Sequence, residues 1–387
     1  MNISLFRLHL FPRKFDWIIE SFTWLKSAGL FLIPIFTYRK GLIMKKYNLI
    51  SKVFTSFTAI TLMTVMLLMG CGTAAADTNG ATDSAAVSDE GTISVVTTIF
   101  PEYDWVRQIV GDNSNVDITM LLDNGVDLHN YQPTAEDIMK VARCDVFIYV
   151  GGESDEWVED ALKEATNKDM KVINLLDELG DSVKEEEVVE GMEAEEEEEE
   201  GEEGEEEEVE YDEHVWLSLK NTKILVDAIA STMEEVDSAN ADAYAKNAQD
   251  YIAKLDELDG KYEEAVKSAN VNTVLFGDRF PFRYLVDDYN LDYFAAFVGC
   301  SAETEASFET ITFLAGKVDE LGLKTVLTIE NSDQKIAKTI IENTKSKDAQ
   351  IVAMDSMQST TSDDVAAGVT YLSVMENNLQ VLTDALN

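Results

Sequence analysis

The stretch from Ala239 to Ala269 reads ANADAYAKNAQDYIAKLDELDGKYEEAVKSA and contains no proline and a single glycine, Gly260. Its apolar side chains recur at spacings of three and four residues, as one face of a long helix requires. They are Tyr244, Ala248, Tyr251, Leu255, Leu258, Tyr262 and Ala265. At 1.5 Å per residue, a helix of about 30 residues reaches roughly 45 Å. A helix of this length can extend across two lobes and join them stiffly.

Short β-branched runs alternate with helical patterns on both sides of this helix. The runs that precede it are ISVVTTIF, VDITMLL, CDVFIYVGG and KVINLL, and those that follow are NTVLFGD, DYFAAF, KTVLTIE and QIVAMD. Helical patterns lie near Asp104–Val110, Thr134–Arg143, Glu156–Ala165, Phe282–Asp288, Phe308–Leu321, Gln334–Asn343 and Asp364–Ala385. Alternation of this kind predicts an α/β protein with mostly parallel sheets. We therefore expect two lobes, at residues 93–235 and 270–387, joined by the long helix at 236–269.

Composition limits the class of ligand. The 387 residues, 45% of them apolar, can build two domains of ordinary size. The formal net charge of −44 argues against nucleic acid, which needs clustered Lys and Arg, and favours cations as partners. Eighteen glutamates and no basic residue lie within residues 185–210. A run of this kind repels itself, so we expect a disordered acidic insertion in the first lobe.

The amino end has the pattern of a secretory signal at residues 44–70. Lys45 and Lys46 precede an apolar core that ends at Gly70 and Cys71. The four residues Leu68 to Cys71 resemble the lipobox of bacterial lipoproteins, which implies a lipid on Cys71 and a protein anchored at the extracytoplasmic face of the cell membrane. An uncleaved membrane anchor is the alternative, although the apolar stretch is short for a span of about 20 residues. Residues 1–43 are interpreted as an upstream extension from a misplaced start codon, and residues 71–92 as a flexible tether.

Two further cysteines, Cys144 and Cys300, are assigned to different lobes. A disulfide between them is conceivable outside the cell. The interpretation that we favour is two small buried side chains.

Candidate metal ligands follow the predicted strands. Ligands of open α/β sheets bind at the carboxyl ends of the strands. His129 lies in the loop after VDITMLL, Asp278 follows NTVLFG, and Asp355 follows QIVAM. His214 comes directly after the acidic insertion, in EVEYDEHVWLSLK. Two imidazoles and two carboxylates suit a divalent transition metal in a cleft between the lobes, although each residue alone is also explained as a helix cap or a surface residue.

The sequence also resembles a known family. The stretches TTIFPEYDWVRQIVGD, GVDLHNYQPTAEDI, DVFIYVGG, DEHVWLSLKN, FGDRFPFRYLVDDY, GCSAETEAS and VTYLSVMENNLQVL are similar to those of zinc and manganese solute-binding lipoproteins of ABC transporters. The resemblance covers residues 93–387. It implies two lobes joined by a rigid long helix, with a metal ion held between them and delivered to a membrane permease and its ATPase.

The resemblance also implies a ligand set. His129 matches the first ligand histidine and His214 the second, while Asp355 falls where the family often places an acidic ligand. Asp278 falls where the family places a third histidine or a glutamate, which is a departure. Asp278 can coordinate the metal directly or act through water. Glu330 is a reserve candidate for a ligand, and the alternative for it is a capping or hydrogen-bonding role at the following helix. Imidazoles favour Zn²⁺, and carboxylates shift preference toward Mn²⁺. Many zinc-binding members of the family carry a charged, His-rich loop before the second histidine, where this chain has glutamates instead.

Other functions remain open at the level of sequence. A metallohydrolase would need an open coordination position with a general base, and no His-Glu-x-x-His pattern occurs, so we expect no enzyme activity. A surface adhesin or scaffold could use the same fold with a structural metal. The acidic insertion is interpreted either as a collector that concentrates cations near His214 or as a solvated segment without a metal role. We expect a monomer that binds no nucleic acid.

Overall fold

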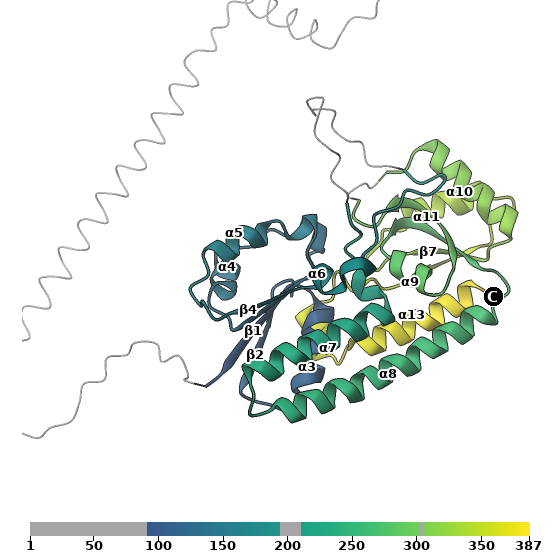
Figure 1. Cartoon of the computed structure of the whole chain (residues 1–387). Coiled ribbons are helices and arrows are strands. Elements are labelled where there is room, and N and C mark those ends of the chain that lie inside the picture. Colours follow the sequence, from purple (N-terminus) through teal and green to yellow (C-terminus); the bar gives the residue numbers. More distant parts are fainter. Residues whose placement is uncertain (1–90, 194–209, 302–304) are drawn as a thin grey trace, which may run out of the picture. The chain divides into compact units, whose positions relative to one another are not determined.

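The structure is a computed structural model that describes residues 91–193, 210–301 and 305–387 (Figure 1). The predicted upstream extension, the signal segment and Cys71 lie outside these ranges, as do most of the tether and of the acidic insertion. Within the described ranges, no helix combines the length and the apolar character needed to cross a lipid bilayer.

The first lobe contains a sheet of four parallel strands in the order β2-β1-β3-β4. The strands are β1 Ile93–Thr97, β2 Val116–Met120, β3 Val146–Tyr149 and β4 Lys171–Asn174. The helices of this lobe are α3 Phe100–Val110, α4 Ala135–Val141, α5 Trp157–Lys163 and α6 Leu175–Leu179, with short 3₁₀ helices η1 Leu128–Asn130, η2 Glu153–Asp155 and η3 Gly180–Ser182. In the register, Val95 lies between Ile118 and Val146, so the central strand β1 is apolar and buried.

The second lobe repeats this plan with parallel strands in the order β6-β5-β7-β8. The strands are β5 Thr273–Phe280, β6 Asp292–Val298, β7 Thr325–Thr328 and β8 Gln350–Ala353. Its helices are α9 Arg283–Asp288, α10 Phe308–Leu321, α11 Lys335–Asn343, α12 Ser362–Ala366 and α13 Tyr371–Ala385. The predicted fold class, α/β with two parallel-sheet lobes, is confirmed.

A pair of long helices connects the two sheets in sequence. They are α7 Leu219–Val236 and α8 Ala241–Lys267. Helix α8 has 27 residues, about 40 Å at 1.5 Å per residue, and it packs against α7, α3 and α13 (Figure 1). Near one end, the Asn247 side chain donates to the Ile109 carbonyl of α3 at 3.0 Å, and further along, the Tyr262 hydroxyl donates to the Met375 carbonyl of α13 at 2.7 Å. The helix therefore contacts elements that lie before and after it in the chain.

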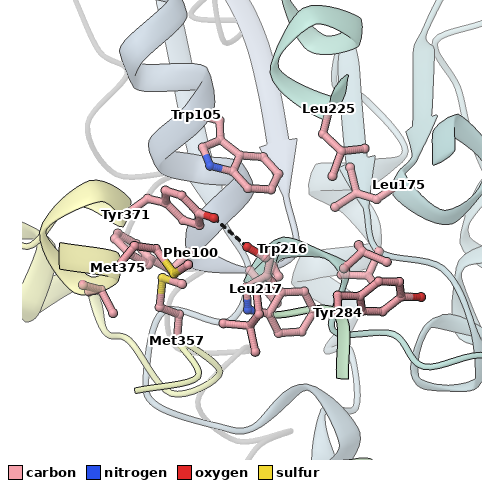
Figure 2. Close-up of a cluster of buried hydrophobic side chains, with 14 of the residues drawn as sticks. Phe100, Trp105, Leu175, Trp216, Leu217, Leu225, Tyr284, Met357, Tyr371 and Met375 are labelled. Carbon is pink, nitrogen blue, oxygen red and sulfur yellow. Dashed lines mark hydrogen bonds between the residues drawn. The ribbon is translucent and has the colours of Figure 1, made fainter. Parts of the chain in front are cut away.

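The short 3₁₀ helix η4, Val215–Leu217, lies in the hydrophobic core and precedes α7. Figure 2 shows Trp216 and Leu217 at the centre of a buried cluster, with Tyr371 and Met375 on one side and Tyr284 on the other. The Trp216 indole donates to the Ser356 carbonyl at 2.8 Å, and the Tyr371 hydroxyl donates to the Trp216 carbonyl at 2.7 Å. Aromatic burial and satisfied hydrogen bonds fix this turn in place.

Three predicted boundaries differ from the structure. The first strand ends at Thr97, and α3 begins at Phe100. Pro101 favours a helix start at this point. The Glu102 carboxylate also caps the helix, because it accepts from the Thr98 and Ile99 amides. The predicted last helix is divided into α12 and α13 at Gly368, whose φ of +99° ends α12. Strand β5 continues to Phe280, beyond its predicted end.

Residues 185–193 of the predicted acidic insertion lie within the described part of the chain. Residues 185–193 are ordered, because Met192 is buried and the Glu193 amide donates to the Ala296 carbonyl of β6 at 3.0 Å. Arg283 also forms an ion pair with Glu187 at 3.0 Å. Met192 is buried and Val189 packs against the hydrophobic core, and a composition count overlooks these apolar contacts.

Candidate metal centre

His129 and His214 are 85 residues apart in sequence and meet in the structure. Their Nε2 atoms lie 3.1 Å apart, and their ring planes are tilted by 54°. Two imidazoles on one tetrahedral zinc ion, each at about 2.0–2.1 Å, would hold their nitrogens about 3.3–3.4 Å apart. The two rings are therefore spaced like two ligands of a single ion.

The His129 ring is oriented from its other nitrogen. Nδ1 lies 2.8 Å from the Ser154 hydroxyl and 3.4 Å from Glu213 Oε2. The Asp127 side chain accepts a hydrogen bond from the His129 amide at 3.1 Å and thereby starts helix η1. Because Nδ1 is engaged, Nε2 is the nitrogen left to bind a metal ion.

The His214 ring is fully buried and held in the same way. The Asp212 carboxylate accepts from the His214 amide at 2.9 Å and lies 3.0 Å from Nδ1. The Trp216 indole packs against the imidazole with ring centroids 5.2 Å apart. An aspartate that orients a histidine is a common arrangement behind metal ligands.

Gly299 forms the floor beneath the His214 ring. A Cβ at this position would lie 2.8 Å from Cε1 and 3.0 Å from Nδ1 of the imidazole, and 3.0 Å from the Phe280 carbonyl oxygen. Real Cβ atoms essentially never come within 3.0 Å of another heavy atom. The loop after β6 can approach the ring this closely only because the residue has no side chain.

A third potential donor is Cys300. One ring nitrogen of each histidine and the Cys300 Sγ lie within 4.8 Å of one another, and this is the one such group of metal-binding donors found among the described residues. Cys300 is only partly buried, so the prediction of two buried cysteines is correct for Cys144 and wrong for Cys300. Both thiols are free. Cys300 follows the end of β6 by two residues, so the strand-end argument that selected the aspartates could have selected it as well.

The two predicted carboxylate ligands lie outside this donor group. Asp278 is inside β5 rather than after it; its Oδ1 accepts from the Arg279 amide, and its buried Oδ2 has no hydrogen-bond partner within the described ranges. Asp355 follows β8 as predicted, but its Oδ1 accepts from the Met357 amide at 2.8 Å. Burial and the nearby Glu330 raise the pKa of Asp355 to about 6.

The reserve candidate Glu330 has a structural role in the turn after β8. Its carboxylate accepts from the Ser356 amide at 2.7 Å and from the Ser356 hydroxyl at 2.8 Å, and it also accepts from the Gln358 amide. Glu330 therefore bonds a distant turn rather than capping α11, the helix that follows it in the chain.

Charges around the histidine pair give the two rings different proton affinities. Burial, the adjacent His214 and Arg279 lower the pKa of His129 well below its ordinary value. Asp127 opposes this shift and raises the pKa in part. Burial would lower the pKa of His214 too, but the Asp212 carboxylate raises it above the ordinary value. A proton on Nε2 of His214 can be shared with Nε2 of His129, and a metal ion would take the place of that proton.

An acidic cavity of about 240 Å³ opens beside this group. His129 and Cys300 line it together with Glu153, Ser154, Glu186, Glu210, Tyr211 and Glu213. On another side, Arg279 of β5 forms an ion pair with Asp127 at 2.6 Å. The site is thus approached through carboxylates, with one guanidinium nearby.

Comparison with known proteins identifies the family. The family described as zinc-uptake complex component A, periplasmic (ZnuA) matches residues 95–385. The chain belongs to the ZnuA family. The predicted resemblance to zinc-binding solute-binding lipoproteins is therefore confirmed at the level of the family.

Two curated members of the ZnuA family illustrate the relationship. The chain is 32% identical over 299 residues to the zinc-binding lipoprotein AdcA of Streptococcus pneumoniae R6, covering 76% of this chain and 56% of AdcA. It is 30% identical over 321 residues to the high-affinity zinc uptake system protein ZnuA of Bacillus subtilis 168, covering 83% of this chain and 94% of that protein. The chain thus spans little more than half the length of the AdcA proteins that it matches, 57% for that of Streptococcus pyogenes serotype M3.

Solved structures of ZnuA-family proteins share the fold. The Zn(II)-bound ZnuA-like domain of Streptococcus pneumoniae AdcA matches with a TM-score of 0.59 at 27% identity, over 76% of this chain and 99% of that domain. The metal-dependent lipoprotein YcdH of Bacillus subtilis matches with a TM-score of 0.61 at 26% identity, over 76% of this chain and 99% of that chain.

Proposed function

We propose that the protein is the extracytoplasmic solute-binding component of an ABC transporter, which captures Zn²⁺ and delivers it to a membrane permease. The observation that carries the proposal is the convergence of two oriented imidazoles, with Nε2 atoms 3.1 Å apart, in a chain of the ZnuA family. The names of its relatives, a zinc-binding lipoprotein and a zinc uptake system protein, support the choice of cargo.

Zinc is preferred over manganese for reasons of ligand chemistry. Imidazole nitrogens suit zinc, whereas manganese favours carboxylate, carbonyl and water oxygens. The two carboxylates nearest the rings, Asp212 and Glu213, face the Nδ1 atoms and orient the histidines. Manganese would need oxygen donors on the Nε2 side of the pair.

Anchoring and transport partners complete the proposal. A lipid on Cys71 would hold the protein at the outer face of the membrane, next to the permease and its ATPase. We expect binding and release without hydrolysis. Replacing Cys71 with serine should release the protein into the soluble fraction or leave the precursor unprocessed, and a Cys71→Ser protein that is processed and anchored like the parent would contradict this part.

The binding step is tested by calorimetric titration of the full chain with Zn²⁺ and Mn²⁺. A structural zinc site of four ligands is worth about 10–16 kcal/mol, hence roughly 2.5–4 kcal/mol per ligand, so losing one histidine should weaken binding about 60- to 700-fold. His129→Ala and His214→Ala should each show this loss. Cys144→Ala, which alters a buried thiol of the first lobe that lies outside the donor group, is the control and should bind like the parent.

The transport step is tested by growth. A strain that lacks the protein should grow poorly under zinc chelation and recover with the parent gene, but not with His214→Ala. Parental zinc affinity in both histidine variants would overturn the proposed site. Normal growth of the deletion strain under chelation would overturn the transport role.

A further inference from the structure

We propose that the Cys300 thiolate is a direct third ligand of the captured ion, so that the centre is a two-histidine, one-thiolate site. The inference rests on the proposed function and deepens it, because it names the donor that sets metal preference. Its starting observation is the grouping of the Cys300 Sγ with one nitrogen each of His129 and His214 within 4.8 Å.

The distances suit a shared ion. With a zinc–sulfur distance of about 2.3 Å and a zinc–nitrogen distance of about 2.0–2.1 Å, tetrahedral geometry places sulfur about 3.5–3.6 Å from each nitrogen. The upper limit of 4.8 Å therefore leaves at most about 1.3 Å of closing movement for the widest pair. Cys300 lies in the loop after β6, next to Gly299, where a small shift or rotation of the side chain can provide this movement.

The loop that carries Cys300 is held against the acidic side of the cavity. The Cys300 amide donates to Glu186 Oε1 at 3.3 Å, and the thiol also hydrogen-bonds this carboxylate. Glu213 lines the same cavity and is 2% exposed. Its Oε2 lies 3.4 Å from His129 Nδ1 but has no hydrogen-bond partner among the described residues. A buried unpaired carboxylate oxygen is costly unless a positive charge stabilises it. A divalent ion on the histidine pair would supply that charge.

Charge balance favours an anionic donor in contact with the ion. Two neutral imidazoles leave the full charge of a divalent cation uncompensated, and the Arg279 guanidinium is close enough to disfavour positive charge on both rings. The carboxylates of Asp212 and Glu213 act only from behind the rings. A thiolate reduces the net charge at the ion itself. The thiol proton leaves when the sulfur binds, and the Glu186 carboxylate, which accepts from the Cys300 amide at 3.3 Å and lines the same cavity, can take it.

A sulfur ligand has consequences for selectivity. Thiolates favour zinc and softer ions over manganese, which prefers oxygen. Three protein donors also leave a fourth tetrahedral position for an exchangeable group, which suits an ion that must be released again. The site should therefore discriminate strongly against manganese and bind cadmium well.

The test replaces zinc with Co²⁺, whose absorption reports sulfur ligation directly. Full-length parent protein should show a near-ultraviolet thiolate-to-cobalt charge-transfer band at one equivalent, and Cys300→Ser should lose it. Cys144→Ala is the matched control, because Cys144 is buried in the first lobe and contacts Met170 and the Val141 carbonyl. It should retain the band.

The same variants separate this inference from the proposed function. Cys300→Ser should weaken zinc binding about 100-fold, the share of one ligand in a four-ligand site, and cadmium binding by more than that. If parent and Cys300→Ser bind cobalt without the band and with equal zinc affinity, the thiolate assignment is overturned while the histidine site stands. A band that persists in Cys300→Ser overturns the assignment too. If the parent binds no zinc and His129→Ala changes nothing, the proposed function itself fails.

Discussion

Replacing Gly299 with alanine tests whether the close packing beneath His214 controls metal binding. The added Cβ would lie 2.8 Å from Cε1 of the imidazole, and ordinary contact begins at 3.4 Å, so the ring or the loop must move by about 0.6 Å, since 3.4 − 2.8 = 0.6. The ring cannot withdraw freely, because Asp212 holds Nδ1 at 3.0 Å and Trp216 packs on its face. Binding sites tolerate displacements of only about 0.5 Å. We therefore expect zinc affinity to fall roughly 10- to 100-fold, as when an orienting group behind a ligand is lost.

The assay combines calorimetric zinc titration with urea unfolding of the metal-free protein. Overpacking should lower the free energy of unfolding by about 1–3 kcal/mol, which leaves the protein folded at 25 °C if its total stability is ordinary. Gly316→Ala is the matched control: it lies in α10, and a Cβ there would meet no atom within 4 Å. That variant should keep the parental affinity and gain about 0.5–1 kcal/mol. Parental zinc affinity in Gly299→Ala would refute the reasoning.

Three further predictions concern the surroundings of the site. The His214 ring binds zinc only when neutral, so the parent should lose zinc affinity as pH falls through the raised pKa of His214. Asp212→Asn should lower this pKa and move the half-loss of zinc binding to lower pH. An unchanged pH profile would contradict this. Trp216→Phe leaves the Ser356 carbonyl without its indole donor and should cost about 1–3 kcal/mol of unfolding free energy in urea titrations. Deleting residues 194–209 should reduce the number of weakly bound Ca²⁺ ions seen by equilibrium dialysis and leave the tight zinc site intact; lost tight binding would place the segment in the site.

The sheets and the histidine pair could be predicted because their signals are local. Buried parallel strands need continuous β-branched runs, and eight of these runs in the sequence correspond to the eight strands of the described residues. The sequence indicates His129 by its position after a predicted strand and His214 by its place in the run after the acidic insertion. The fold brings the two rings together. The turn that carries His214 was also visible as an aromatic and apolar run, although its anchoring to Ser356 and Tyr371 depends on segments about 150 residues away.

Which of the residues after strand ends approach the histidines could not be predicted, because this depends on register and packing. Cys300 resembles an ordinary small core residue by composition, and only the approach of Gly299 to the His214 ring brings its sulfur to the site. Asp355 satisfies the same strand-end rule as a ligand would, yet its carboxylate folds back onto the amide of Met357. Position after a strand therefore selects candidates without fixing where their side chains point.

Strand β5 shows how one irregularity alters a site. Its register against β6 pairs Phe276 with Ala295 and Arg279 with Phe297, so three steps along β5 match two along β6 and one extra residue is present. Strict alternation is broken there, and both Asp278 and Arg279 line a second cavity, of about 460 Å³, which Asp127 and Glu330 line as well. Arg279 reaches Asp127 and opposes positive charge on both imidazoles. A proton and a zinc ion bring positive charge to the same place, so the guanidinium disfavours both. Zinc can offset this repulsion because it binds several donors at once, whereas a proton is held by one nitrogen or shared between the two.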